Sequence, residues 1–255
     1  MKKSVVIIGI GEIGGVFARG FLKLGHPVFP VNRNTDMDQA AGEFPEPELV
    51  MLAVGEKDLH PTLEKIPTAW RDKLVLIQNE LLPRDWAQHG LEQPTVISVW
   101  FEKKPGMDAK VVVPSPVYGP HARTIIQALE AVQLPAYEVD TPEQLLFELV
   151  RKNLYILTTN IGGLKVGGNV TTLWQDNRDV AKAVANDVLT IQEYLTGQSL
   201  DRDALIAAMV EAFDGDPEHG CMGRSAPARL QRALEIADKA GLQVPALQDI
   251  QNSPG

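Results

Sequence analysis

The sequence contains a single cysteine, Cys221, among 255 residues. One cysteine excludes an intramolecular disulfide and a cysteine-built zinc cage, and it is typical of a protein that works in a reducing cytoplasm. His219 lies two residues away, but no triad accompanies the pair, which favours a plain thiol over a nucleophile. The five histidines are scattered without metal-ligand spacing, so the sequence predicts no metal site.

Long apolar runs are also missing. No stretch of about 18 residues is continuously apolar, which is the length that a membrane-spanning helix needs. The basic start Met1-Lys2-Lys3 resembles that of an export signal, but Gly9, Gly11 and other residues interrupt the apolar run that follows. These features predict a protein without an export signal or a membrane span.

Basic residues are fewer than acidic ones. The 24 Lys and Arg residues stand against 33 Asp and Glu residues, which gives a formal net charge of -9. Such a chain repels a nucleic-acid backbone, so no nucleic-acid partner is expected. Hydrophobic residues make up 44% of the chain and charged residues 22%, as in globular proteins long enough for two modest domains.

What is present begins with a strand, a glycine turn and a helix. Residues 4–8 form a short β-branched run typical of a strand buried on both faces. Apolar residues then recur at helical spacing from Ile13 to Leu24, Gly25 ends the helix, and residues 28–31 begin a second strand. This βαβ unit predicts a parallel sheet covered by helices.

The pattern continues to residue 141 and then changes. Further strands are expected at 49–54, 74–77 and 96–99, with an edge strand at 110–113, a helix at 122–132 and the end of the sheet near Val139. Helical periodicity then predominates, with helices expected at 143–161, 176–196, 201–212 and 226–240. The sequence therefore predicts an α/β fold: a Rossmann-type doubly wound parallel sheet in residues 1–141 and an all-helical domain in residues 142–255.

The turn after the first strand is a G-x-G-x-x-G motif, formed by Gly9, Ile10, Gly11, Glu12, Ile13 and Gly14. The first glycine permits the tight turn, the second lets the backbone approach a pyrophosphate, and the third lets the helix pack on the strand. The helix N-terminus adds unpaired amides for the phosphates. Between a strand and a helix, the motif predicts dinucleotide binding.

Asn32 and Arg33 at the end of the second strand favour NADP(H) as the cofactor. NAD, FAD and S-adenosylmethionine sites tend to have an acidic residue at this point, whereas a 2′-phosphate favours arginine. The first acidic residue, Asp36, comes too late unless the loop folds back. A solvated loop cation is the alternative interpretation of Arg33.

Several short motifs, in the same order along most of the chain, resemble those of the ketopantoate reductase family. They are Gly25-His26-Pro27-Val28 followed by Arg33, a Gln-Asn-Gly-like turn at Gln78-Asn79-Glu80, Tyr118-Gly119-Pro120, and a helix with Lys152 and Asn160. The resemblance implies a two-domain NADPH-dependent reductase of a small 2-keto acid such as ketopantoate, with its active site between the domains. The sequence leaves a homodimer open. By the same resemblance, Lys152 is the general acid, and Asn79 and Asn160 orient the substrate or the nicotinamide.

The chemistry of reduction agrees with this assignment. Hydride addition creates an alkoxide, which needs a proton donor beside it. Lys152, Tyr155 and Thr159 form one helical stripe, which suggests a cleft and makes Tyr155 a second candidate donor. A snorkelling lysine, with Asn160 capping a helix that ends at residues 162–163, is the alternative.

Three positions depart from the family's pattern. The lysine expected directly after the third strand is replaced by Gly55, with Lys57 the nearest lysine, and a second helix asparagine is Ile156. The substrate-binding glutamate has no counterpart in residues 223–227, where Arg224 and Ser225 are either carboxylate ligands or surface residues. A different hydroxyacid or imine-type substrate, or a noncatalytic NADPH-binding sensor, therefore remains an alternative.

Overall fold

The computed structural model describes residues 1–253 and divides into two compact units, Met1–Glu148 and the chain from Leu149 onward. The division falls inside helix α6 (Pro142–Val166). The expected boundary at residue 141 coincides instead with the start of that helix.

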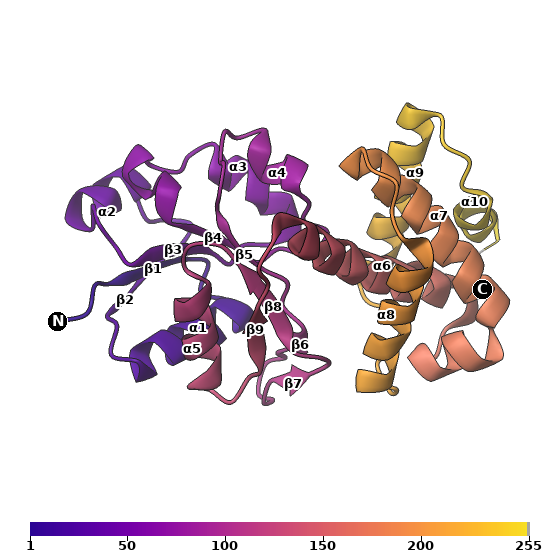
Figure 1. The fold of residues 1–255 in the computed structure, drawn as a ribbon, viewed down its shortest axis with the longest axis horizontal. Coiled ribbons are helices and arrows are strands. Elements are labelled where there is room, and N and C mark those ends of the chain that lie inside the picture. The colour runs from indigo at the N-terminus through magenta and orange to yellow at the C-terminus, as the bar shows by residue number, and fades with distance from the viewer. Residues whose placement is uncertain (254–255) are drawn as a thin grey trace. The chain divides into compact units, whose positions relative to one another are not determined.

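The first unit is built on a seven-stranded sheet with the order β2-β1-β3-β4-β5-β8-β9 (Figure 1). The chain runs parallel from β2 to β5, β8 is antiparallel to β5, and β9 is parallel to β8. Because β2 and β3 lie on opposite sides of β1, the strand order reverses there, which is where ligands bind in such sheets. The strands are β1 (Val5–Ile8), β2 (Val28–Val31), β3 (Leu49–Leu52), β4 (Leu74–Leu76), β5 (Thr95–Ile97), β8 (Ser115–Tyr118) and β9 (Ala136–Glu138).

Helices cover both faces of this sheet. Helices α1 (Glu12–Lys23) and α5 (Ala122–Glu130) lie together on one face, and α2 (Met37–Glu43), α3 (Leu59–Leu63) and α4 (Pro83–Ala87) lie on the other (Figure 1). Short 3-10 turns occur at η1 (Glu56–Asp58) and η2 (Thr68–Lys73). The α1 face holds a continuous core that includes Phe17, Ile125 and alternate residues of the strands, such as Val5 and Ile7. The expected doubly wound sheet is therefore confirmed.

The strand expected at 110–113 is shorter than expected and lies outside the main sheet. Only β7 (Lys110–Val111) forms, and it pairs with β6 (Phe101–Glu102) in a separate two-stranded sheet. The strand that joins the main sheet is β8, which contains Pro116 and was not among the expected strands. Pro116 lacks an N–H, but its carbonyl oxygen accepts a hydrogen bond from the Ser98 amide at 3.0 Å, so the strand keeps an anchor there.

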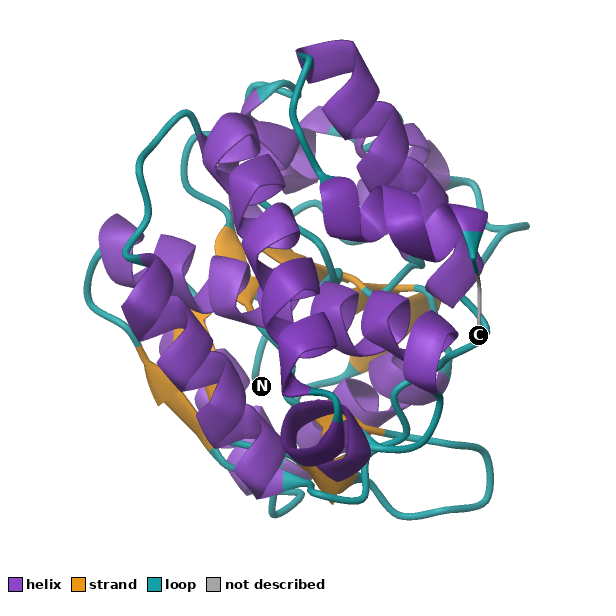
Figure 2. Cartoon of the chain, turned by 90° about the vertical axis from the view of Figure 1, so that its right-hand side faces the viewer, coloured by secondary structure: helices purple, strands orange, loops and turns teal. Residues whose placement is uncertain are grey.

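The second unit is helical throughout (Figure 2). It contains the rest of α6, a π turn η3 (Thr172–Asp176), α7 (Arg178–Thr196), α8 (Arg202–Gly215), α9 (Ala226–Ala240) and α10 (Pro245–Asn252). The four expected helices are present, and α10 is an addition. Among the residues that the structure describes, no helix combines the length and apolarity required to cross a membrane.

Helix α6 continues through Gly162 and Gly163, where the sequence suggested its end. A Cβ on Gly163 would lie 2.8 Å from the carbonyl carbon of Cys221, and a Cβ on Gly162 would lie 3.0 Å from Leu173. The two glycines therefore serve close packing, and Gly167, at φ +66°, is the first residue in a helix-ending conformation.

Buried polar contacts fix the neighbours of α6. Arg151, only 7% exposed, donates from Nε to the Ala208 carbonyl oxygen at 3.0 Å and from Nη2 to Glu211 at 3.1 Å. Asn153 donates to Gln192 of α7 at 3.1 Å. Since buried polar groups are costly without partners, these bonds specify how α7 and α8 pack on α6.

Candidate functional site

A cavity of about 1100 Å³ opens at the carboxyl ends of β1, β2 and β3. Its volume lies just above the range of about 300 to 1,000 Å³ that is usual for small-molecule sites. The cavity lies where the strand order reverses, as expected for a nucleotide site in this class of sheet. Its walls comprise residues 8–11 of the glycine loop, residues 31–33 after β2, residues 53–55 after β3, and further residues between Thr35 and Thr68.

The three motif glycines have three different surroundings. Gly9 has φ +97°, and a Cβ there would lie 2.7 Å from the Ala53 carbonyl oxygen. A Cβ on Gly14 would lie 2.1 Å from the Gly9 carbonyl oxygen, so this glycine lets α1 pack against the loop. A Cβ on Gly11, which lines the cavity, would meet nothing within 4 Å. Gly11 therefore leaves open space in the cavity wall at the point where the motif predicts a pyrophosphate.

The N-terminus of α1 is suited to an anion. Its N-cap is Gly11, which has no side chain to accept from the first amides of the helix. The first hydrogen bond back to this residue runs from the Gly15 amide to the Gly11 carbonyl oxygen at 2.8 Å. The preceding N–H groups of the first turn have no intrahelical acceptor and carry the positive end of the helix dipole.

Asn32 and Arg33 form the turn between β2 and α2. The Asn32 side chain accepts from the Asn34 amide at 3.0 Å, and the Asn32 amide donates to the Thr35 hydroxyl at 3.2 Å. These bonds order the turn, on which Arg33 is exposed and lines the cavity. Asp36 does not line it, since its carboxylate caps α2 by accepting from the Asp38 and Gln39 amides.

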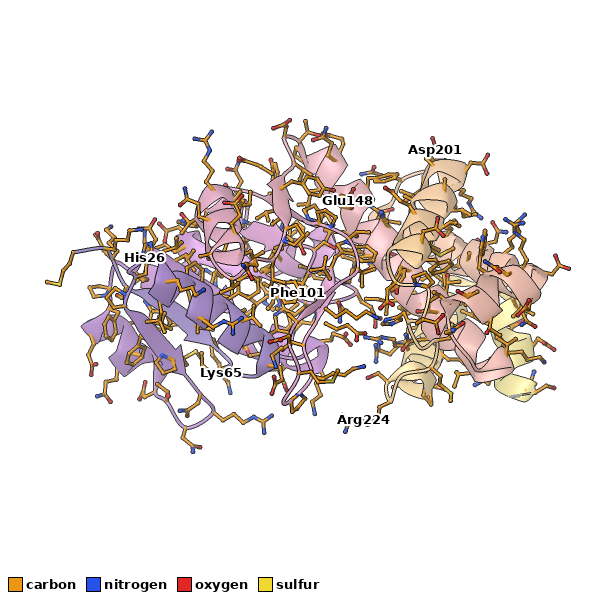
Figure 3. The ribbon with its side chains drawn as sticks, turned by 90° about the horizontal axis from the view of Figure 1, so that it is seen from below. His26, Lys65, Phe101, Glu148, Asp201 and Arg224 are labelled. Carbon is orange, nitrogen blue, oxygen red and sulfur yellow. The ribbon has the colours of Figure 1, made fainter. Side chains whose placement is uncertain are left out.

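The wall between β3 and η2 was not found from the sequence. It contributes Asp58, Glu64 and Lys65 to the cavity, and Asp38 of α2 adds another carboxylate. Lys65 is exposed (Figure 3). The rule that ligands bind at the carboxyl ends of parallel strands could have identified the start of this wall. The side chains that follow depend on how the loop folds.

The remaining motif residues do not line the cavity. Glu12 forms an ion pair with Lys103 at 3.2 Å. Ile13 is partly buried and packs against the core on the face of the sheet that α1 covers. Lys57, the lysine nearest to the end of β3, is exposed on η1 and also lies outside the cavity lining.

Asn79 follows β4 in a turn at the same sheet edge. The buried Gln78 donates from Nε2 to the Leu52 carbonyl oxygen at 2.7 Å, which ties the ends of β3 and β4 together. Glu80 has φ +60°, the conformation that a Gln-Asn-Gly turn gives its glycine. Asn79 is half-buried and does not line the cavity.

Lys152 and Asn160 both lie on α6, in the second unit. Lys152 is half-buried, whereas Asn160 is 8% exposed and its Oδ1 accepts from the Arg229 Nη1 of α9 at 2.9 Å. Sequence reasoning missed Arg229, because no local pattern joins residues 69 positions apart. The bond fixes the Asn160 oxygen toward α9, while the amide nitrogen donates one N–H to the Thr159 hydroxyl at 3.5 Å and keeps a second N–H.

Two residues of the polar stripe expected on α6, Tyr155 and Thr159, are buried, whereas Lys152 is half-buried. Tyr155 is 4% exposed and its ring packs 5.5 Å from that of Phe213. Thr159 is fully buried and donates back to the Tyr155 carbonyl oxygen at 2.8 Å. Residues 153–163 are all buried, so this part of α6 has no solvent-facing stripe.

Arg224 and Ser225 are exposed in the loop before α9, and Figure 3 labels Arg224. No group of three or more His, Cys, Asp or Glu side chains in residues 1–253 is arranged to hold a metal ion. His60 and His89 do meet, with Nδ1 and Nε2 2.9 Å apart. Burial and the neighbouring His60 lower the pKa of His89.

Cys221 is fully buried, and burial raises the pKa of its thiol from 9.0 to about 12. We expect native protein at pH 8 to resist Ellman's reagent, while urea-unfolded protein reacts at once. Because the folded pKa is the higher one, the neutral thiol contributes stability below about pH 9 that is lost as the pH rises toward 12. Rapid labelling of the native protein would contradict this burial.

Comparisons with known proteins identify the fold. No protein-family model and no curated protein sequence matches the chain. A 2-dehydropantoate 2-reductase from Methylococcus capsulatus matches at a TM-score of 0.69 with 13% identity, covering 98% of this chain and 94% of its own. A dimeric ketopantoate reductase from Staphylococcus aureus (0.64, 16%, 98% and 96%) and a D-mandelate dehydrogenase in complex with NADH (0.68, 14%, 98% and 96%) also match. The chain therefore has the fold of the ketopantoate reductases.

Proposed function

We propose that the chain is an NADP(H)-dependent oxidoreductase of the ketopantoate reductase family, which reduces the ketone of a small 2-keto acid. The cavity at the glycine loop carries this proposal. Its open space beside Gly11 suits a pyrophosphate, and Arg33 suits a 2′-phosphate because a guanidinium forms paired hydrogen bonds with phosphate oxygens. The shared fold with ketopantoate reductases supports the reaction class.

Different residues would bind the cofactor, donate the proton and position the substrate in such a reduction. Gly9, Ile10 and Gly11 hold the pyrophosphate, and Asn32 orders the turn that presents Arg33. Bound NADPH supplies the hydride. Lys152 donates a proton to the carbonyl oxygen as it becomes an alkoxide, and Asn160, with its oxygen held by Arg229, offers an N–H to a substrate oxygen. We assign Asn79 to positioning the substrate or nicotinamide.

Arg33→Ser should reduce the preference for NADPH over NADH. Losing a charge-assisted bond to the 2′-phosphate is expected to weaken NADPH binding by about 10- to 100-fold and to leave NADH unchanged. Fluorescence titration measures both dissociation constants. Lys23→Ser is a control, since Lys23 lies at the other end of α1 and donates to the Ala131 carbonyl oxygen. An equal loss for both nucleotides would remove the 2′-phosphate role from Arg33.

A second candidate is an NAD-linked dehydrogenase of a 2-hydroxy acid. Asp38 lines the cavity and could accept from ribose hydroxyls, and a D-mandelate dehydrogenase with the same fold binds NADH. We also propose a homodimer, because one ketopantoate reductase with this fold is dimeric. Sedimentation equilibrium tests the proposed dimer by measuring whether the molar mass in solution is that of one chain or of two.

The decisive assay combines a panel of 2-keto acids with NADPH and a panel of 2-hydroxy acids with NADP and NAD, followed by nicotinamide absorbance. Turnover of a keto acid with NADPH supports the proposal. Turnover only of hydroxy acids with NAD supports the second candidate. Selective nucleotide binding without turnover on either panel favours the noncatalytic sensor.

A further inference from the structure

Glu12 and Lys103 form an ion pair beside the glycine loop that cofactor binding, as assigned above, does not use. Glu12 is the first residue of α1 and directly follows Gly11, which lines the cavity. The Lys103 Nζ lies 3.2 Å from Glu12 Oε2. The lysine side chain is 21% exposed and the glutamate side chain 43%, so the pair is partly shielded from water.

A carboxylate at this position works against a phosphate-binding loop. In a helix without ligand, a glutamate in the first turn stabilises the helix by opposing its dipole. A pyrophosphate brought to the same terminus carries two negative charges, which the Glu12 carboxylate repels. A glycine loop that contains Glu12 therefore needs a nearby positive charge to offset this repulsion.

The fold holds Lys103 where that charge is needed. Lys103 directly follows β6, whose Phe101, labelled in Figure 3, is 6% exposed. The ring centroid of Phe101 lies 6.2 Å from that of Phe17 on α1. The Lys103 Nζ also donates to the Lys104 carbonyl oxygen at 2.8 Å. These two contacts anchor the ammonium beside the first turn of α1.

We propose that Lys103 is a positioning residue for the cofactor: by neutralising Glu12, it allows a dinucleotide pyrophosphate to dock at the N-terminus of α1. This inference rests on the proposed cofactor role of the cavity. It implies that a ligand with a pyrophosphate depends on the pair. Adenosine 2′-monophosphate, which has no pyrophosphate, does not.

The test is a double-mutant cycle read by nucleotide affinity. Lys103→Met should weaken NADPH binding about 10-fold, the effect expected for an uncompensated charge near a phosphate. Glu12→Gln combined with Lys103→Met should return the affinity to within about threefold of Glu12→Gln alone. Lys103→Arg, which keeps the charge, should bind as the wild type does. Adenosine 2′-monophosphate should bind all four variants equally.

Lys104→Met is the matched control. It removes the same charge from the same hairpin, but Lys104 pairs with Glu102 at 3.4 Å, so NADPH affinity should not change. Equal weakening in Lys103→Met and in the double variant would mean that Lys103 acts on the nucleotide directly, which overturns the proposal. Wild-type affinity in Lys103→Met also overturns it. Failure of the wild-type protein to bind NADPH would instead defeat the proposed function, and this inference with it.

Discussion

Gly11→Val is expected to abolish nucleotide binding while the protein still folds. Gly11 has φ -87° and ψ -163°, a conformation open to valine, and a Cβ there meets no atom within 4 Å. The added side chain enters only the space proposed for the pyrophosphate. We expect the dissociation constant for NADPH to rise at least about 100-fold, or about 2.7 kcal/mol, measured by fluorescence titration. Loss of folding stability should stay below about 1 kcal/mol.

Two neighbouring glycines are controls for this result. Gly15 also has open space around its Cβ but does not line the cavity, so Gly15→Ala should keep NADPH affinity and stabilise α1 slightly. Gly14→Ala should behave differently, because its Cβ would lie 2.1 Å from the Gly9 carbonyl oxygen and must displace α1. If Gly11→Val binds NADPH as the wild type does, the pyrophosphate does not dock at this loop.

Lys152→Ala is expected to lose turnover and keep the cofactor. Removing a general acid lowers kcat by about 10²- to 10⁴-fold. The cavity proposed for NADPH lies in the first unit and does not include Lys152, so the dissociation constant for NADPH should be unchanged. The measurement pairs kcat, on the substrate found in the panel, with nucleotide titration. A pH profile of kcat that loses its alkaline limb in Lys152→Ala supports proton donation by the lysine.

Lys165→Ala is the matched control, because Lys165 lies on the same helix and pairs with Asp249 at 3.2 Å. Its loss should lower stability by less than about 1 kcal/mol and leave kcat unchanged. Wild-type turnover in Lys152→Ala would exclude this lysine from the mechanism. An equal fall in both variants would indicate a general disturbance of α6.

The strands up to β5 and helix α1 could be predicted because local patterns determine them. Buried parallel strands are continuous apolar runs, and glycines mark the turns between them. The β8 strand was missed because Pro116 disfavours a strand locally, and only pairing with β5 and β9 offsets this. The eight-residue α10 is too short for a periodic signal and is fixed by Asp187, which accepts from its first amides at 2.7 and 3.1 Å.

In the candidate site, too, the residues next to strand ends were predictable, whereas contacts between distant elements were not. The glycine loop and Arg33 are adjacent to strand ends, so their meeting in one cavity follows from the parallel sheet. The Asn160–Arg229 and Glu12–Lys103 contacts depend on packing between elements distant in sequence. The burial of Thr159 was not predictable from the stripe on α6, because a buried threonine hydroxyl can donate to a carbonyl oxygen of its own helix.

Titration of the wild-type protein with NADPH and NADH shows directly whether the glycine-loop cavity binds a dinucleotide. Nicotinamide fluorescence measures each dissociation constant. At a nucleotide concentration of about 100 times the dissociation constant, bound nucleotide should raise the free energy of unfolding by about 2.7 kcal/mol, which a thermal melt detects. We expect saturable binding of both nucleotides, with NADPH bound at least about 10-fold more tightly through Arg33. Absence of binding by either nucleotide would contradict the assignment of the glycine-loop cavity as a dinucleotide site.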